Sequence, residues 1–181
     1  MDGGCVSNTP LEAVLEDMPP GHTVVFAIDL WSASGPAPET MDEVQARAKQ
    51  ILYASRTAHH VDSIATKVNL RRAMRQLAGD GPGTGASDSD QRMDIVHIIY
   101  HPSQDQITAS DAEFSRASIA ERRDAGYADM RRALGAAPWH RAQTPAPLGC
   151  MVHRVTPDAI TTLAEPNLGR TTDRKAAELP S

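Results

Sequence analysis

The sequence predicts an α/β fold, in which helices cover both faces of a sheet that contains parallel strands. Two apolar, β-branched segments, residues 23–31 and 93–100, have the length and composition of strands that are buried on both faces. A long stretch with helical spacing separates them, and strands that are joined through helices form the crossovers of α/β sheets. Because so few strands cannot cover all of the predicted helices, we expect an incomplete sheet.

Three capping boxes mark the expected starts of helices, at residues 9–12, 40–43 and 110–113. The first box opens a short helix that reaches Leu15. The second opens a helix with one apolar stripe, which we expect to be buried and which comprises Met41, Val44, Ala48, Ile51, Leu52 and Ser55. A separate helix is expected from about residue 61 to 78, with an apolar stripe of Leu70, Met74 and Leu77. The third box opens a helix to about Leu134.

The helix that is expected from residue 110 has two apolar arcs, which indicates packing on two sides. The arcs are Phe114, Ser118 and Ala125, and Ile119, Tyr127, Met130 and Leu134. Residues 79–91 are polar and of low complexity. Residues 149–155 are predicted to form a short edge strand, and residues 156–181 a disordered tail.

Composition excludes several classes of protein. The formal charge of the 181 residues is -5, which does not favour nucleic-acid binding, because phosphate contacts require concentrated Lys and Arg. Cys5 and Cys150 cannot form the disulfide framework of a secreted domain. The N-terminal residues contain no Lys or Arg and no long apolar run, so no signal peptide is indicated. We therefore expect a soluble, reduced, cytoplasmic protein without a membrane span.

The opening string DGGCVSNTPLEAVLED resembles the aspartate segment of bacterial patatin-like phospholipases. Later blocks resemble the uncharacterised domain that follows the patatin domain: VVFAIDLWSASGPAPETMDEV, ILYASRT, NLRRAMRQL, IVHIIY and DAEFSRASIAERRDAGYADMRRAL. Together these blocks cover about residues 2–155. The resemblance implies an incomplete three-layer patatin-type sandwich with a helical C-terminal extension. It divides the chain into the end of a catalytic domain (1–31), a patatin-associated domain (32–155) and the tail (156–181).

The same resemblance implies hydrolysis of lipid acyl esters by a Ser-Asp dyad. In such a dyad the serine hydroxyl needs a base within hydrogen-bonding reach, and backbone N–H groups bind the oxyanion. By position Asp2 is the general base, and Gly3 and Gly4 form the motif's tight turn. The 181 residues contain no Gly-x-Ser-x-Gly string and no oxyanion loop, so we expect the chain alone to be inactive. The adjacent α-amino group would also lower the basicity of Asp2.

Several partners follow from this interpretation. They are a lipid or acyl-ester substrate, a complementing half that carries the serine, and a second copy paired through an open sheet edge. Lys67, Arg71 and Arg75 share one helix face that could contact anionic lipid at a membrane periphery, although a solvated face is the more ordinary interpretation. The alternative function is a non-catalytic binding or regulatory module that docks on a partner chain or a lipid surface.

Other polar residues have ordinary interpretations beside functional ones. Asp29 ends a predicted strand, where site residues of α/β folds occur, but capping a loop or pairing with an arginine is the more common role. The pairs His59/His60 and His97/His101 lack the carboxylates or cysteines that accompany zinc ligands, so structural or surface roles are favoured. No metal and no cofactor is expected.

Overall fold

The computed structural model describes residues 10–16, 19, 21–77, 92–101, 114–140 and 149–163. The residues outside these ranges include two predicted segments, the low-complexity residues 79–91 and the last part of the tail, 164–181. In chain order the elements are α1 (Leu11–Glu16), β1 (His22–Asp29), α2 (Met41–Leu77), β2 (Arg92–Ile99), α3 (Arg116–Ala136), the 3-10 helix η3 (Pro138–His140), β3 (Cys150–Val155) and β4 (Ile160–Leu163).

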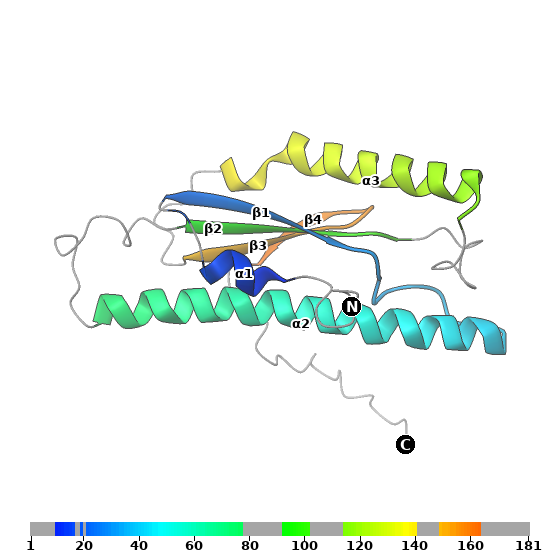
Figure 1. Ribbon diagram of the computed structural model, residues 1–181, viewed down its shortest axis with the longest axis horizontal. Coiled ribbons are helices and arrows are strands. Elements are labelled where there is room, and N and C mark those ends of the chain that lie inside the picture. Colours follow the sequence, from blue (N-terminus) through cyan, green and yellow to red (C-terminus); the bar gives the residue numbers. More distant parts are fainter. Residues whose placement is uncertain are drawn as a thin grey trace, which may run out of the picture.

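The four strands form one sheet in the order β1-β2-β3-β4. The first three strands are parallel, with Val25 opposite Ile95 and Ile95 opposite Val152, and β4 runs antiparallel to β3. Figure 1 shows α2 below the sheet and α3 above it, with the small α1 on the α2 side. The predicted α/β class and the two predicted buried strands are therefore confirmed, and the described residues form three layers.

Each face of the sheet has its own apolar core. On the α2 face the buried side chains are Leu11, Ala27, Val61, Ile64, Ala65, Met93, Ile95, Cys150 and Val152. On the α3 face they are Val96, Ile98, Ala133, Trp139 and Val155, with Phe26 packed edge-on against Trp139. Strand β2 contributes to both cores, as its continuous apolar sequence predicted.

Helix α2 is one continuous helix of 37 residues, so the prediction of two helices, ending near 55 and restarting near 61, is wrong. Its sequence contains no Gly or Pro that would end it. The predicted capping box at its start is confirmed, because the Glu43 N–H donates to Thr40 Oγ1 and the Thr40 N–H donates to the Glu43 carboxylate, both at 3.3 Å. At about 1.5 Å per residue, α2 is far longer than the eight-residue strands and extends beyond them at both ends (Figure 1).

The first half of α2 faces the opposite way from the prediction. Met41 is 72% exposed, Ile51 47% and Leu52 50%, whereas Gln50, Ala54 and Thr57 are buried. The middle of the helix sets this orientation, because Val61 and Ile64 pack on the sheet and the preceding turns continue the same helix. The most regular apolar stripe of the sequence therefore points away from the sheet.

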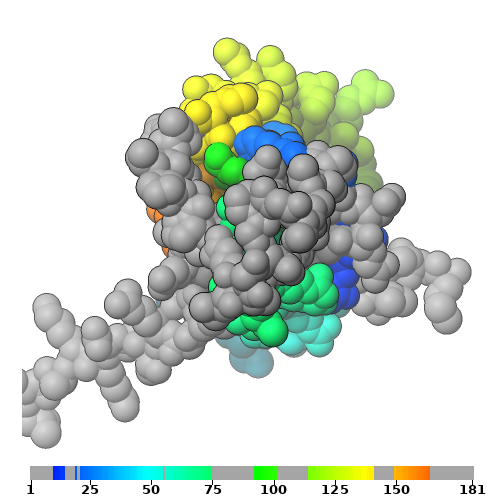
Figure 2. Space-filling view, turned by 90° about the vertical axis from the view of Figure 1, so that its left-hand side faces the viewer, coloured from blue at the N-terminus to red at the C-terminus, as the bar shows by residue number. Residues whose placement is uncertain are grey.

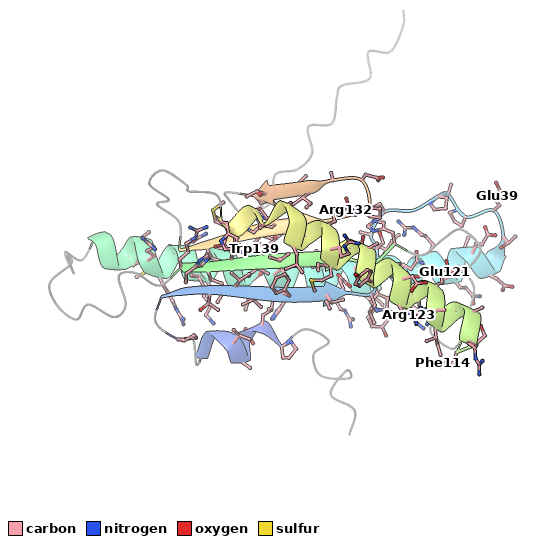
Figure 3. All side chains as sticks on the ribbon, turned by 90° about the horizontal axis from the view of Figure 1, so that it is seen from above. Glu39, Phe114, Glu121, Arg123, Arg132 and Trp139 are labelled. Carbon is pink, nitrogen blue, oxygen red and sulfur yellow. The ribbon has the colours of Figure 1, made fainter. Side chains whose placement is uncertain are left out.

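Helix α3 also packs on one side only, so the prediction of two packed sides is wrong. Its buried residues are Ser118, Asp129 and Ala133, while Ile119, Tyr127 and Leu134 are exposed. Ser115 caps its N-terminus by accepting the Ser118 N–H at 3.2 Å, and residues 110–113, where the capping box was expected, lie outside the described residues. Figure 3 shows α3 crossing the sheet from Trp139 towards Phe114, which lies at the end that projects past the strands.

The C-terminal strands correct two further predictions. Strand β3 was expected at an edge, but it lies between β2 and β4. Strand β4 falls where a disordered tail was expected from residue 156, and a tight turn creates it, because the Thr156 N–H donates to the Ala159 carbonyl at 3.0 Å. The boundary after residue 31 stays a prediction, although β1 on one side of it pairs with β2 on the other along its whole length.

Candidate functional site

The predicted catalytic residues Asp2, Gly3 and Gly4 lie outside the described residues. The first described element after them is α1, which is anchored because Leu11 is buried with Ala27 and Val61 on the α2 face. Elsewhere among the described residues, two groups of buried polar side chains stand out.

The first group lies at the carboxyl ends of the parallel strands, on the α2 face. Asp29 ends β1 and is buried; its Oδ1 accepts the Trp31 N–H at 3.0 Å, and its Oδ2 is 3.3 Å from His97 Nε2. The ordinary interpretation of Asp29 as the cap of a loop is thus correct, and its side-chain partner is a histidine instead of an arginine. His97 is completely buried, and its Nδ1 has no hydrogen-bond partner among the described residues.

Arg154 continues this group across the sheet. The strand register places His97 beside Arg154, on neighbouring strands and the same face. Two hydrogen bonds of 2.8 Å join Arg154 Nη2 to both carboxylate oxygens of Asp62 on α2, so this pair connects β3 to the helix. The Nε atom of Arg154 is buried and has no hydrogen-bond partner in the part of the chain that the structure describes. Some buried nitrogen atoms of this group therefore lack hydrogen bonds within the described residues.

The loop after β1 is attached to α2 by aromatic and polar contacts. Trp31 stacks on Tyr53 with 5.1 Å between ring centroids. Arg47 donates to the carbonyls of Ser32 and Ala33. Ser32 is buried, but its hydroxyl donates to the Ser34 carbonyl at 2.9 Å and contacts no base, so its bonding is that of a turn residue and not of a nucleophile.

The second group is centred on Asp94, which is completely buried on the α3 face. Its Oδ1 lies 2.7 Å from His153 Nε2, and its Oδ2 lies 2.6 Å from His22 Nε2 and 2.9 Å from Arg92 Nε. His153 Nδ1 in turn lies 2.9 Å from the Thr162 hydroxyl. The Asp94 carboxylate thus connects β2 directly to β1 and β3, and it is linked to β4 through His153.

Hydrogen bonding decides the ionisation of Asp94. Burial by itself would raise the pKa of this carboxyl, but the hydrogen bonds from His153, Arg92 and His22, together with the charge of Arg92, outweigh burial and lower the pKa below its ordinary value. Asp94 is therefore a stable carboxylate with three donors, which is the arrangement of a structural ion cluster.

Thr162, His153 and Asp94 have the connectivity of a hydroxyl, a base and an orienting carboxylate. His153 is completely buried, however, and both of its ring nitrogens are occupied by these two contacts. The Asp94 carboxylate is also shared with Arg92 and His22. We infer that these three side chains hold β4 on the sheet and do not act in nucleophilic catalysis.

Within the described ranges, no group of three or more His, Cys, Asp or Glu side chains could hold a metal ion. Cys150 is a free, buried thiol, and burial, with the nearby Asp94 charge, raises its pKa to about 12. It is therefore unreactive at neutral pH. In the part of the chain that the structure describes, no helix has the length and apolar character needed to cross a membrane.

Comparison with known proteins gives one match. Residues 51–146, more than half of the chain, match the family that is described as "Patatin phospholipase". The chain belongs to this family. The matched range begins inside α2, includes β2, α3 and η3, and does not include Asp2, Gly3 and Gly4. No curated protein and no solved structure matches the chain.

Sequence reasoning missed the Asp94 cluster completely. The available signal was a charged residue inside a strand that is otherwise apolar, since a carboxylate buried on a sheet face requires donors. Its donors are 2, 59 and 72 residues away along the chain, at Arg92, His153 and His22. Only the folded structure could identify them.

Proposed function

We propose that this chain is the C-terminal segment of a patatin-like serine acyl hydrolase that acts on phospholipids or related esters. In this proposal Asp2 is the general base of a Ser-Asp dyad, and Gly3 and Gly4 provide the turn that brings it close to the serine. The observation that carries the proposal is the family match over residues 51–146.

The proposed reaction has two steps. Asp2 accepts the proton of the serine hydroxyl as the oxygen attacks the ester carbonyl, and the alcohol leaves with that proton while the acyl group stays on the serine. Water then attacks the acyl-serine, and Asp2 again takes and returns one proton. The serine and its oxyanion donors would come from residues outside these 181, because the chain contains no Gly-x-Ser-x-Gly string.

Two surfaces at the carboxyl ends of the strands support docking of a serine-bearing segment. Among the described strands, β1 pairs with β2 alone; Ile28 in β1 is 58% exposed, and Leu30, just after the strand, is 67% exposed. At the same end of the molecule lies the first half of α2, with the outward stripe that includes Met41, Ile51 and Leu52. Ligands of open α/β sheets bind at this end of the strands.

Complementation tests this proposal. The purified chain is mixed with a segment of a patatin-like protein that carries Gly-x-Ser-x-Gly, and hydrolysis of a p-nitrophenyl ester is followed. We expect no turnover by the chain alone, turnover by the mixture, and a loss of at least about 100-fold with Asp2→Ala. The exposed Asp124, replaced by Asn, is the matched control that should keep full activity. Turnover by the chain alone that Asp2→Ala abolishes would contradict the proposal.

The docking surface has its own test. Replacing both Ile51 and Leu52 by Glu should abolish binding of the serine-bearing segment, because two charges would be buried without partners. Ala128→Glu, on the exposed side of α3, should leave binding unchanged. If the chain binds partners through this stripe but never supports hydrolysis, the alternative function, a non-catalytic binding module, replaces the enzyme proposal.

A further inference from the structure

The C-terminal half of α2, residues 63–77, has an outer face that combines large apolar and basic side chains. Lys67, Leu70, Arg71 and Met74 follow one another at helical spacing, and all four are exposed. Leu70 is 59% exposed and Met74 61%. The opposite side of the same turns is packed on the sheet, where Ile64 and Ala65 are buried. The two apolar side chains therefore lie on the surface next to two cations.

Charge is distributed unevenly along α2. Residues 41–62 contain three basic and three acidic residues, whereas residues 63–77 contain four basic residues and no acidic one. This half of the helix therefore has a net charge of +4. Because the whole chain has a charge of -5, the remaining residues carry -9. The basic segment is an exception in an acidic protein.

Hydrogen bonds attach this half of α2 to the sheet. The Asn69 side chain donates to the Cys150 carbonyl at 3.0 Å and accepts the Cys150 N–H at 2.7 Å, which fixes the helix to the start of β3. Neither the Lys67 nor the Arg71 side chain forms a hydrogen bond or an ion pair with another residue that the structure describes. Figure 2 shows the molecule from the end at which α2 finishes, with α3 at the top of the view and α2 at the bottom.

We propose that the outer face of residues 63–77 docks on an anionic lipid surface. A helix that lies in a membrane interface inserts its apolar side chains at the boundary of the acyl chains and places Lys and Arg among the headgroups. Leu70 and Met74 would insert, and Lys67 and Arg71 would pair with lipid phosphates or carboxylates. The argument depends on exposure and charge, and it is independent of the role of Asp2.

The charge of this face also favours a lipid surface over a second copy of the chain as its occupant. Two copies that paired through this face would bring two segments of charge +4 into contact, and these like charges would repel each other. The N-terminal half of α2, with equal numbers of acids and bases, lacks this obstacle and suits a protein segment. The two halves of one helix are therefore assigned to different partners.

Vesicle binding by the full chain tests the proposal without any hydrolysis. We compare vesicles of phosphatidylcholine with vesicles that contain about 30 mol% phosphatidylserine, by sedimentation. Binding should require the anionic lipid and weaken with added salt. Lys67→Gln with Arg71→Gln should lower the partition coefficient roughly 30-fold, since each cation near such a surface contributes about 1 kcal/mol. The matched control neutralises Arg116 and Arg123, which are exposed on α3 across the sheet, and should have little effect.

A second pair of variants tests the apolar contribution. Leu70→Gln with Met74→Gln keeps the charge and should weaken binding to anionic vesicles about tenfold, while circular dichroism reports an unchanged fold. Equal losses in the α2 and α3 charge variants, or no binding to anionic vesicles, would overturn the proposal. A change of oligomeric state in the Leu70/Met74 variant without vesicles would also overturn it, in favour of a protein partner.

Discussion

Buried polar groups at the two ends of the parallel strands differ in how completely they are hydrogen-bonded. Near the amino ends, Asp94 has three donors at 2.6–2.9 Å, and Asn69 occupies both backbone groups of Cys150. At the carboxyl ends, Asp29 and His97 approach only to 3.3 Å, and neither His97 Nδ1 nor Arg154 Nε has a hydrogen-bond partner within the described ranges. The two ends also differ in apolar exposure, because Ile28 and Leu30 are exposed at the carboxyl end.

This difference indicates which end has a structural role. A buried polar group without a partner costs free energy, so folded proteins rarely keep one unless another requirement maintains it. The amino end has the closed hydrogen-bond network of a region that stabilises the fold. Within the described residues, the carboxyl end has two buried nitrogens without hydrogen-bond partners and exposed apolar side chains, and this is the end at which α/β proteins bind ligands.

The largest effect should come from Asp94→Asn. The variant removes the charge that faces Arg92, His22 and His153 and leaves these donors with a neutral amide. We expect the free energy of unfolding to fall by about 3 kcal/mol, at the lower end of the range for a broken buried ion pair, because Arg92 and His22 partly reach solvent. Urea denaturation followed by circular dichroism measures this change.

The matched control is Asp124→Asn, which breaks an exposed ion pair with Arg123 on α3. Its effect should stay within about 0.5 kcal/mol. If Asp94→Asn had an effect as small as this control, the Asp94 cluster would not be the stabilising centre of the amino end, and the comparison between the two ends would fail.

The second prediction concerns pH. Because the pKa of Asp94 is lowered in the folded state, its contribution is fully present above the unfolded value of about 3.9 and is lost as the pH falls towards the folded pKa. The urea midpoint should therefore fall as the pH decreases below about 4.5, and fall less in Asp94→Asn. Equal slopes in the two proteins would show that other carboxyls cause the acid sensitivity.

Much of the fold could be predicted from local sequence. The strands β1 and β2 follow from continuous apolar runs, and the start of α2 follows from the Thr40–Glu43 capping box. The direction in which a helix faces could not be predicted, because a regular apolar stripe does not specify what it packs against. In α2 the anchoring of Val61 and Ile64 turned the stripe of Met41 and Ile51 outward.

The candidate site was predictable to a smaller extent. The capping role of Asp29 follows from its place at a strand end, but its pairing with His97 depends on the parallel register of β1 and β2. Strand β4 could not be foreseen from a short polar segment, because its stability comes from pairing with β3 and from the contact of Thr162 with His153. Both features depend on contacts between distant residues.

A smaller effect than that of Asp94→Asn is expected for Asn69→Ala. The variant leaves the N–H and the carbonyl of the buried Cys150 without their present partners, which should cost about 2 kcal/mol. Ser63→Ala, at an exposed position of the same helix, is the control and should change stability little. Thermal denaturation of both variants measures the difference. A loss in the control equal to that in Asn69→Ala would mean that the contact of Asn69 with Cys150 is not the cause of the effect.

The smallest effect should come from Asp29→Asn at the carboxyl end. Asparagine can still accept the Trp31 N–H, and the contact that changes is the long one to His97, so we expect a loss of at most about 1 kcal/mol. Measured beside Asp94→Asn under the same conditions, this variant tests the comparison directly, since both replace one buried aspartate of the same sheet. A loss as large as that of Asp94→Asn would mean that the carboxyl end is also a stabilising network. A small loss, or a gain, would mean that Asp29 and His97 can change without harm to the fold, as is expected of groups at the end where a ligand or the serine-bearing segment would contact them.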